Sequence, residues 1–375
     1  MKRSDLNTPV YLVDEKKLKH NLEILKNVQD ETGCRILLAQ KAFSMFRVYP
    51  LIGEYLCGAT ASGLFEAKLA HEEMKKENHV FSPAFTKDEM KEICEICDHI
   101  SFNSLTQLEY HRKIWEKKKV SVGIRINPEY STQEGHEIYD PCAPGSRLGI
   151  TRDEMGDELP DGVEGLHFHT LCEQDAQPLV ETFHEVEKKF GSFLKKIKWI
   201  NLGGGHHITR EGYDLEALKS LIRYITDTYH VTVYLEPGEA IALNAGYLIT
   251  TVMDVVGNDI PILILDTSAA CHMPDVLEMP YRPPLIGAGK PGEKRYTERL
   301  GSRTCLAGDV IGDYSFDHVV EVGERLVFED MAIYSMVKNN TFNGMPLPDI
   351  ALEHEDGECE VVKHFTYDDF KMRLS

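Results

Sequence analysis

The sequence lacks any apolar run long enough to cross a membrane. Apolar runs such as Pro261–Leu265 are only a few residues long in a chain of 375, whereas a membrane-spanning helix needs about 20. The opening residues MKRSDLNTPV carry two basic side chains but no apolar segment behind them. We therefore expect neither a membrane span nor a secretory signal.

Basic residues are also scarce relative to acidic ones. The chain has 41 Lys and Arg against 61 Asp and Glu, a formal net charge of −20. Such a charge repels phosphate backbones and anionic membrane surfaces, so neither nucleic acid nor membrane is an expected partner. A solubilising surface is the simplest explanation of the acidic excess, and attraction of a cationic ligand is the more specific one.

Cysteine is too sparse and too scattered for a disulfide framework. The nine cysteines are an odd number, which suits reduced thiols and a cytoplasmic location. Cys94 and Cys97 form one CxxC in the expected helix KDEMKEICEIC, with no second pair. Core packing is therefore favoured there over zinc or redox chemistry, and no metal is predicted.

Eight short β-branched runs alternate with longer segments of helical period, such as Ser62–Lys76, which is typical of parallel βα units. The expected strands are Arg35–Phe43, Glu54–Ala61, His79–Phe85, His99–Ser104, Val120–Asn127, Val163–His169, Lys198–Gly203 and Thr232–Glu236. This repeat predicts an α/β fold, a (β/α)8 barrel over residues 15–245. Strand-like runs after the barrel, with PVYLVD before the helix Glu15–Gln29, predict a discontinuous β domain over 1–14 and 246–375.

Chemically unusual residues follow several of these strands, where barrel active sites lie. Lys41 ends the first strand, where partial desolvation would favour a neutral, Schiff-base-forming amine. A lysine that reaches solvent or pairs with a carboxylate is the alternative. Gly203, Gly204 and Gly205 end the seventh strand and offer backbone N–H groups to a phosphate, although a plain tight turn is as good a reading.

Other strand-end residues allow two interpretations each. Glu236 ends the eighth strand, where a buried carboxylate needs a cationic partner such as a pyridinium nitrogen or Arg125. His169 could stack on a planar cofactor or be a hydrogen-bonded core histidine. The adjacent His206 and His207 have no third ligand at metal-binding spacing.

The expected β domain has its own candidates. Cys305 and Asp309, in CLAGD, could supply a proton donor and an anchor for a substrate amine, or simply pack in a turn. Asp266, at the end of PILILD, is a further candidate substrate-binding acid. Tyr334 and the run Phe342-Asn343-Gly344 follow.

Taken in order, AQKAFS, FHTLCE, NLGGGHH, EPGEA, CLAGD and the segment from Tyr334 to Phe342-Asn-Gly resemble the fold type III pyridoxal-phosphate decarboxylases. The resemblance covers nearly the whole chain. It implies pyridoxal 5'-phosphate as cofactor, bound covalently by Lys41 and stacked against His169. It further implies phosphate contacts from Gly203–Gly205 and Tyr334, and a contact between Glu236 and the pyridine nitrogen.

The same resemblance implies a homodimer with active sites at its interface. Cys305 of a neighbouring subunit would protonate the substrate Cα after carbon dioxide leaves, and Asp309 would help bind the far end of the substrate.

Departures from the family pattern indicate the substrate. Glu239 stands after EPG where many relatives have arginine, Leu306 stands where an acid is usual, and Thr60 stands where ornithine enzymes carry aspartate. A substrate-side glutamate favours a ligand with extra amines. The motifs are most similar to the carboxynorspermidine decarboxylase branch, which implies decarboxylation of carboxynorspermidine or carboxyspermidine in polyamine biosynthesis.

Three alternatives stay open. A diaminopimelate, ornithine or arginine decarboxylase would share the fold. A non-catalytic pyridoxal-phosphate carrier would have a barrel but no second domain with a Cys305-type loop. A barrel enzyme acting on a phosphorylated substrate would need no pyridoxal phosphate.

Overall fold

The computed structural model describes residues 1–133 and 137–375, which form two compact units. One unit is Asn21–Ile241, and the other combines Met1–His20 with Ala242–Ser375. None of the helices in the described ranges is both long enough and apolar enough to cross a membrane.

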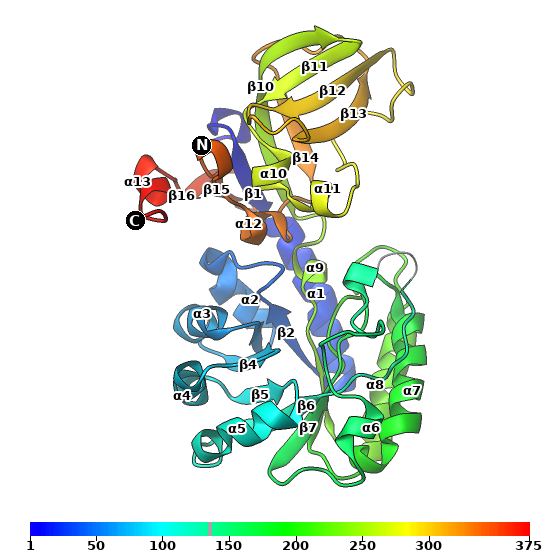
Figure 1. Cartoon of the computed structure of the whole chain (residues 1–375). Helices are drawn as coiled ribbons and strands as arrows, with labels where there is room; N and C mark the ends of the chain where they lie inside the picture. The colour runs from blue at the N-terminus through cyan, green and yellow to red at the C-terminus, as the bar shows by residue number, and fades with distance from the viewer. Residues whose placement is uncertain (134–136) are drawn as a thin grey trace. The chain divides into compact units, whose positions relative to one another are not determined.

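The first unit is a closed barrel of eight parallel strands (Figure 1). They are β2 (Arg35–Ala39), β3 (Gly58–Ala61), β4 (Glu77–Ser82), β5 (His99–Phe102), β6 (Ser121–Arg125), β7 (Val163–His167), β8 (Trp199–Asn201) and β9 (Thr232–Leu235). Every predicted barrel strand is present, so the predicted fold class is confirmed. The first part of the predicted strand Glu54–Ala61 is wrong, because helix α2 (Tyr49–Tyr55) extends through it.

Helices surround the barrel strands, as Figure 1 shows for α2 to α5 and α6 to α8. They are α1 (Glu15–Thr32), α2, α3 (Leu64–Leu69), α4 (Lys87–Ile96), α5 (Leu105–Trp115), α6 (Arg152–Met155), α7 (Ala176–Leu194), α8 (Leu215–Tyr229) and α9 (Glu239–Ala242). Side-chain caps set several starts: Thr86 caps α4, Ser104 caps α5 and Asp214 caps α8. The predicted helix Ser62–Lys76 is instead α3 continued by a π-helix, Ala70–Met74.

Inside the barrel, at the start of β8, the large ring of Trp199 packs against two glycines, Gly123 and Gly165. A Cβ atom built on Gly165 would lie 2.1 Å from the Trp199 ring, and one on Gly123 would lie 2.3 Å from it. The indole Nε1 of Trp199 donates to the Ser121 hydroxyl at 2.8 Å. Glycine on neighbouring strands therefore makes room for a tryptophan whose polar edge is also satisfied.

The second unit contains a mainly antiparallel sheet in the order β13-β12-β11-β10-β1-β15-β16, with β14 also paired to β10. Its strands are β1 (Val10–Asp14), β10 (Gly246–Asn258), β11 (Ile260–Leu265), β12 (Tyr296–Ser302), β13 (Val310–Phe316), β14 (Arg325–Glu329), β15 (Asp349–Glu353) and β16 (Cys359–Lys363). Its short helices are α10 (Ala269–His272), α11 (Asp275–Glu278), α12 (Ser335–Lys338) and α13 (Tyr367–Lys371). The segment PVYLVD is a strand of this sheet, as its sequence predicts.

We expect Gly165→Ala to destabilise the barrel by about 1–3 kcal/mol, the usual cost of overpacking a rigid core. Denaturant unfolding followed by intrinsic fluorescence would measure the loss. Gly257→Ala is the matched control, because a Cβ there has no neighbour within 4 Å. Equal effects of the two substitutions would contradict the proposed contact with Trp199.

Candidate active site

A cavity lies at the C-terminal ends of the barrel strands. Three of the residues predicted from sequence line it: Lys41, His169 and Glu236. The lining also includes Ala39, Thr60, Ala61, Ser62, Phe81, Arg125 and His167. These residues come from separate βα units. The barrel alone therefore assembles this cavity from segments that are far apart in the chain.

Lys41 reaches solvent at the mouth of the cavity while its amine is crowded by the cavity walls. Its Nζ lies 3.5 Å from Nε2 of His169. Burial, and then the positive charge of Arg125, lower the pKa of Lys41 from its usual 10.5. A larger share of the amine is thus neutral at physiological pH, which is the form that attacks an aldehyde.

His169 is oriented by the backbone of the glycine loop. The N–H of Gly204 donates to Nδ1 of His169 at 2.9 Å, so the neutral ring carries its proton on Nε2, facing Lys41. Burial, followed by the charge of Lys41, holds the pKa of His169 well below 6.5. The ring is therefore a neutral flat surface at the cavity, rather than a second cation beside the lysine.

Glu236 is a buried carboxylate, 8% exposed, with several polar neighbours. Asn201 Nδ2 donates to its Oε1 at 2.6 Å, and Nε2 of His167 lies 3.5 Å from its Oε2. Burial raises the pKa of Glu236, but His167, His79 and hydrogen bonds from Asn201 and Thr60 outweigh it and lower the pKa below 4.5. The carboxylate is therefore ionised, as a partner of a cationic nitrogen must be.

The three glycines after β8 are required by close backbone packing. Gly203 has φ of +72° and Gly205 has φ of +84°, a region that side chains rarely adopt. A Cβ on Gly204 would lie 2.1 Å from the carbonyl oxygen of Glu236, and one on Gly205 would lie 1.8 Å from that of Leu171. The loop therefore packs directly on its neighbours, and its phosphate contact stays a prediction.

Arg125 is a cavity residue that sequence reasoning placed only as a possible partner of Glu236. The buried guanidinium donates to the carbonyl of His169 at 2.9 Å and lies 4.5 Å from the centre of the Phe81 ring. Desolvation lowers the pKa of Arg125 to about 10, so it stays charged. Its charge acts on Lys41, which the strand pattern alone did not indicate.

The substrate candidate Glu239 is paired within the barrel unit. Its Oε2 lies 2.9 Å from Nε2 of His207, and Nδ1 of His206 lies 2.7 Å from the hydroxyl of Tyr213. The two adjacent histidines thus contact different partners. The substrate-binding role of Glu239 stays a prediction.

The predicted loop residues of the second unit are organised around Asn343 and Asp309. Asn343 Oδ1 accepts from the backbone N–H of the exposed Cys305 at 2.8 Å, which ties the Phe-Asn-Gly motif to the cysteine loop. Asp309, 4% exposed, accepts from three hydroxyls and one amide, on Ser268, Ser302, Thr304 and Ala270. Its substrate role stays a prediction, and this bonding makes support of the loop the stronger reading.

Asp266 and Tyr334 also lie in the second unit. Asp266 accepts from the hydroxyls of Thr8 and Thr250 at 2.6 and 2.5 Å and from the N–H of Thr251 at 3.0 Å. Tyr334 is the N-cap residue before α12, with φ of +56°, an uncommon backbone conformation for a bulky residue. The binding roles assigned to both from sequence stay predictions.

The comparisons with known proteins agree over almost the whole chain. Residues 10–332 match the family described as "Pyridoxal-dependent decarboxylase, C-terminal sheet domain". The chain is 42% identical over 379 residues to a carboxynorspermidine/carboxyspermidine decarboxylase of Campylobacter jejuni, covering 98% of each. It is also 42% identical over 373 residues to a carboxyaminopropylagmatine decarboxylase of Synechocystis, covering 99% of this chain and 96% of the relative.

A solved structure is similar to this chain in fold as well as in sequence. The carboxynorspermidine decarboxylase of Campylobacter jejuni complexed with norspermidine is similar with a TM-score of 0.92 and 41% identity. The match covers 98% of this chain and 100% of that one. Both the barrel and the sheet unit therefore have counterparts in one solved chain.

We expect Lys41 to be modified by trinitrobenzenesulfonate with a pH midpoint below 10.5, because burial and Arg125 both disfavour the ammonium form. Peptide mass spectrometry over a pH series, on protein freed of bound small molecules, would measure it. Arg125→Gln removes the neighbouring charge and should raise the midpoint. A midpoint that falls or does not move in Arg125→Gln would contradict the assigned cause.

Proposed function

Because this chain belongs to the pyridoxal-dependent decarboxylases, we propose that it removes the carboxylate of a carboxylated polyamine as carbon dioxide. The observation that carries the proposal is 42% identity over nearly full length to two relatives named for such substrates. The solved neighbour complexed with norspermidine supports the same substrate class.

The residues of the cavity fit pyridoxal phosphate. Lys41 offers an amine with a lowered pKa for the aldehyde, and Glu236 offers a buried ionised carboxylate for the ring nitrogen. Nε2 of His167 is buried without a hydrogen-bond partner beside that carboxylate, as expected of a site built for a further polar group. We propose that His169 contacts the ring face and that Gly203–Gly205 and Tyr334 bind the phosphate.

When bound, pyridoxal phosphate supplies an electron-accepting ring for the pair of electrons released with carbon dioxide. In our proposal Glu236 keeps a proton on the ring nitrogen, and the neutral His169 adds no competing positive charge beside Lys41. The thiol of Cys305 donates a proton to the substrate Cα after the carboxylate leaves. Asn343 positions the backbone of that cysteine.

We propose further that residues 15–245 are the cofactor-binding barrel and that 1–14 and 246–375 form the second domain. In this proposal the protein is a homodimer, and the second domain of one subunit contributes Cys305 and Asp309 to the active site of the other. These are the expectations from the family resemblance, and the exposure of Cys305 in a single chain supports them.

The substrate class is narrower than that of the family. The two relatives at 42% identity are named for carboxynorspermidine or carboxyspermidine and for carboxyaminopropylagmatine. All three names denote a carboxylated chain with additional cationic nitrogens. Glu239 is a carboxylate at the position where Arg would favour a second substrate carboxylate, so we propose it as the anchor for a substrate amine.

We expect the purified holoenzyme to release carbon dioxide from these three polyamine acids with kcat/KM at least about 100-fold above that for diaminopimelate, ornithine or arginine, because losing a charge-assisted contact to the anchoring carboxylate costs up to about 3 kcal/mol. Lys41→Ala is the inactive control and should lose the visible absorbance of the bound cofactor. A preference for diaminopimelate would overturn the proposed substrate class.

We expect Glu239→Gln to raise KM for the preferred polyamine acid roughly 10-fold or more with little change in kcat, because a charge-assisted hydrogen bond is worth about 1.5–3 kcal/mol. Glu211→Gln, at an exposed glutamate between β8 and α8, is the matched control. An unchanged KM in Glu239→Gln would exclude the anchoring role.

A further inference from the structure

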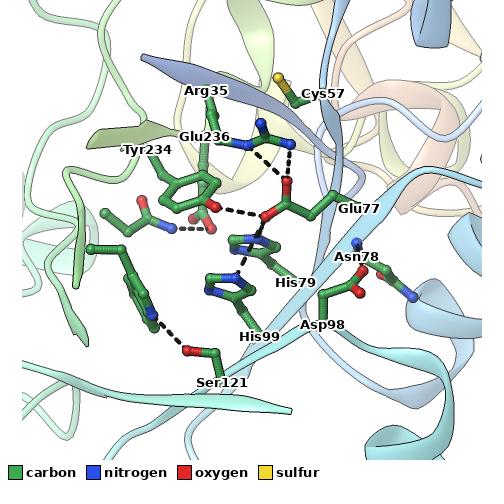
Figure 2. A network of polar contacts seen from close by, with 12 residues as sticks. Arg35, Cys57, Glu77, Asn78, His79, Asp98, His99, Ser121, Tyr234 and Glu236 are labelled. Carbon is green, nitrogen blue, oxygen red and sulfur yellow. Dashed lines mark hydrogen bonds and ion pairs between the residues drawn. The ribbon is translucent and has the colours of Figure 1, made fainter. Parts of the chain in front are cut away.

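A polar network lies inside the barrel, and Figure 2 shows Glu77 at its centre. One oxygen of Glu77 accepts from the Tyr234 hydroxyl at 2.7 Å and lies 2.9 Å from Nε2 of His79, and the other accepts from Arg35 Nε at 2.8 Å. The ligand atoms of Glu77, His79 and His99 lie within 4.8 Å of one another. The two histidine rings are stacked with planes within 7°, so they do not aim their nitrogens at a common point. The geometry favours hydrogen bonding around the Glu77 carboxylate over a metal centre.

A second polar network lies in the second unit, around the loop that carries Cys305. Asp309 ends this loop, and its carboxylate accepts four hydrogen bonds at 2.5–3.1 Å. The donors are the hydroxyls of Ser268, Ser302 and Thr304 and the N–H of Ala270. Burial raises the pKa of Asp309, but these hydrogen bonds outweigh it and lower the pKa below 3.8. Two of the donors lie at the start of α10 and two lie just before Cys305, so Asp309 ties the cysteine loop to α10.

The short helix α10 is a firm support for this loop. Its residues Ala269, Cys271 and His272 are fully buried. Nε2 of His272 donates to the carbonyl of Pro346 at 3.0 Å, and Nδ1 therefore accepts from the hydroxyl of Thr267 at 2.9 Å. Both ring nitrogens of this buried histidine are satisfied, which fixes the orientation of α10.

Asn340 binds the same helix and leads into the Phe-Asn-Gly motif. Its backbone N–H donates to the carbonyl of Cys271 at 2.9 Å, and its Nδ2 donates to the carbonyl of Ala270 at 2.8 Å. Its Oδ1 accepts from the N–H of Phe342 at 3.0 Å. One asparagine side chain thus holds both α10 and the turn that follows it.

Asn343 closes the circuit. Its Oδ1 accepts from the N–H of Cys305 at 2.8 Å. Contacts therefore run from the cysteine loop through Asp309 to α10, and from α10 through Asn340 and Asn343 back to Cys305. Residues 305–308 are all exposed, so core packing does not fix this stretch, and the hydrogen-bonded circuit supplies its support.

We propose that Asn340 and Asp309 are positioning residues that hold the Cys305 thiol in place for proton transfer to the substrate Cα. The inference rests on the proposed role of Cys305 as proton donor and names the support on which that role depends. A proton donor must lie within hydrogen-bond reach of its acceptor, and a displacement of about 1 Å can cost roughly 100-fold in rate. Asp309 then acts through the loop, and its loss affects turnover more than substrate affinity.

The test measures Asn340→Ala and Asp309→Asn in the full-length holoenzyme. Asn340→Ala removes both side-chain hydrogen bonds, and Asp309→Asn keeps the shape of the side chain but loses the charge that the hydroxyls bind. Four quantities are measured: hydrogen exchange of the peptide that contains the Cys305 amide, kcat, KM and the thermal midpoint. Asn258→Ala, at an exposed asparagine that ends β10, is the matched control.

We expect both variants to speed exchange at the Cys305 amide about fivefold or more, the size of one hydrogen bond. Both should lower kcat about tenfold while KM stays within about twofold. Asn258→Ala should change neither. A raised KM with unchanged kcat in Asp309→Asn would show that Asp309 contacts the substrate, and would overturn its positioning role. Unchanged kcat in both variants, with a lowered thermal midpoint and faster exchange throughout the second unit, would mean that the two residues are merely structural.

Cys305→Ala separates this inference from the proposal beneath it. Unchanged kcat in Cys305→Ala would refute the role of Cys305 itself. A loss of kcat in Cys305→Ala, with unchanged kcat and unchanged exchange in Asn340→Ala and Asp309→Asn, would refute only the support of the loop by these two residues.

Discussion

Charge inside a closed barrel has to be neutralised by the barrel itself, because little water reaches the interior to solvate it. Removing one partner of a buried pair typically costs 3–5 kcal/mol. Glu236 meets this constraint with Asn201, Thr60 and two histidines, and Glu77 meets it with Arg35 and Tyr234. The lowered pKa of Lys41 follows from the same balance, since burial and Arg125 both disfavour its ammonium form.

Aromatic side chains and polar side chains lie next to one another inside the barrel. Trp199 occupies the volume that glycines on β6 and β7 leave open, and its ring also lies 4.9 Å from His99. The aromatic ring thus both fills space beside the two glycines and packs against His99. Nearer the cavity, the Phe81 ring contacts both the guanidinium of Arg125 and, edge-on, the ring of His167, so an apolar ring packs against these two polar side chains.

The sequence predicts the barrel well because short apolar strands alternate with segments of helical period, and it predicts the cavity because several strands end in unusual residues. Lys41, His169, the glycine run and Glu236 all follow apolar strands, and parallel strands bring such ends together. His79 and Glu77 were not predicted as parts of the interior network, because they precede or begin the apolar part of β4 and look like solvent-facing residues. Only closure of the barrel reveals that the alternating positions of β4 point inward.

Pairings across loops were equally hidden from the sequence. Asp309 resembles a free acid in CLAGD, yet its hydroxyl partners come from two separate segments, around residue 268 and around residue 303. The link between Cys305 and Asn343 joins residues 38 positions apart. Such contacts depend on the path of the loops, which local residue patterns do not encode.

The order in which the chain is synthesised matters for one strand. β1, near the N-terminus, pairs with β10 on one side and with β15 on the other, where Val10 faces Asp349. The ribosome therefore releases all of the barrel segment before β15 exists. A nascent chain can therefore complete its barrel while one edge of β1 still lacks its partner strand, and the sheet is finished only when the last strands emerge.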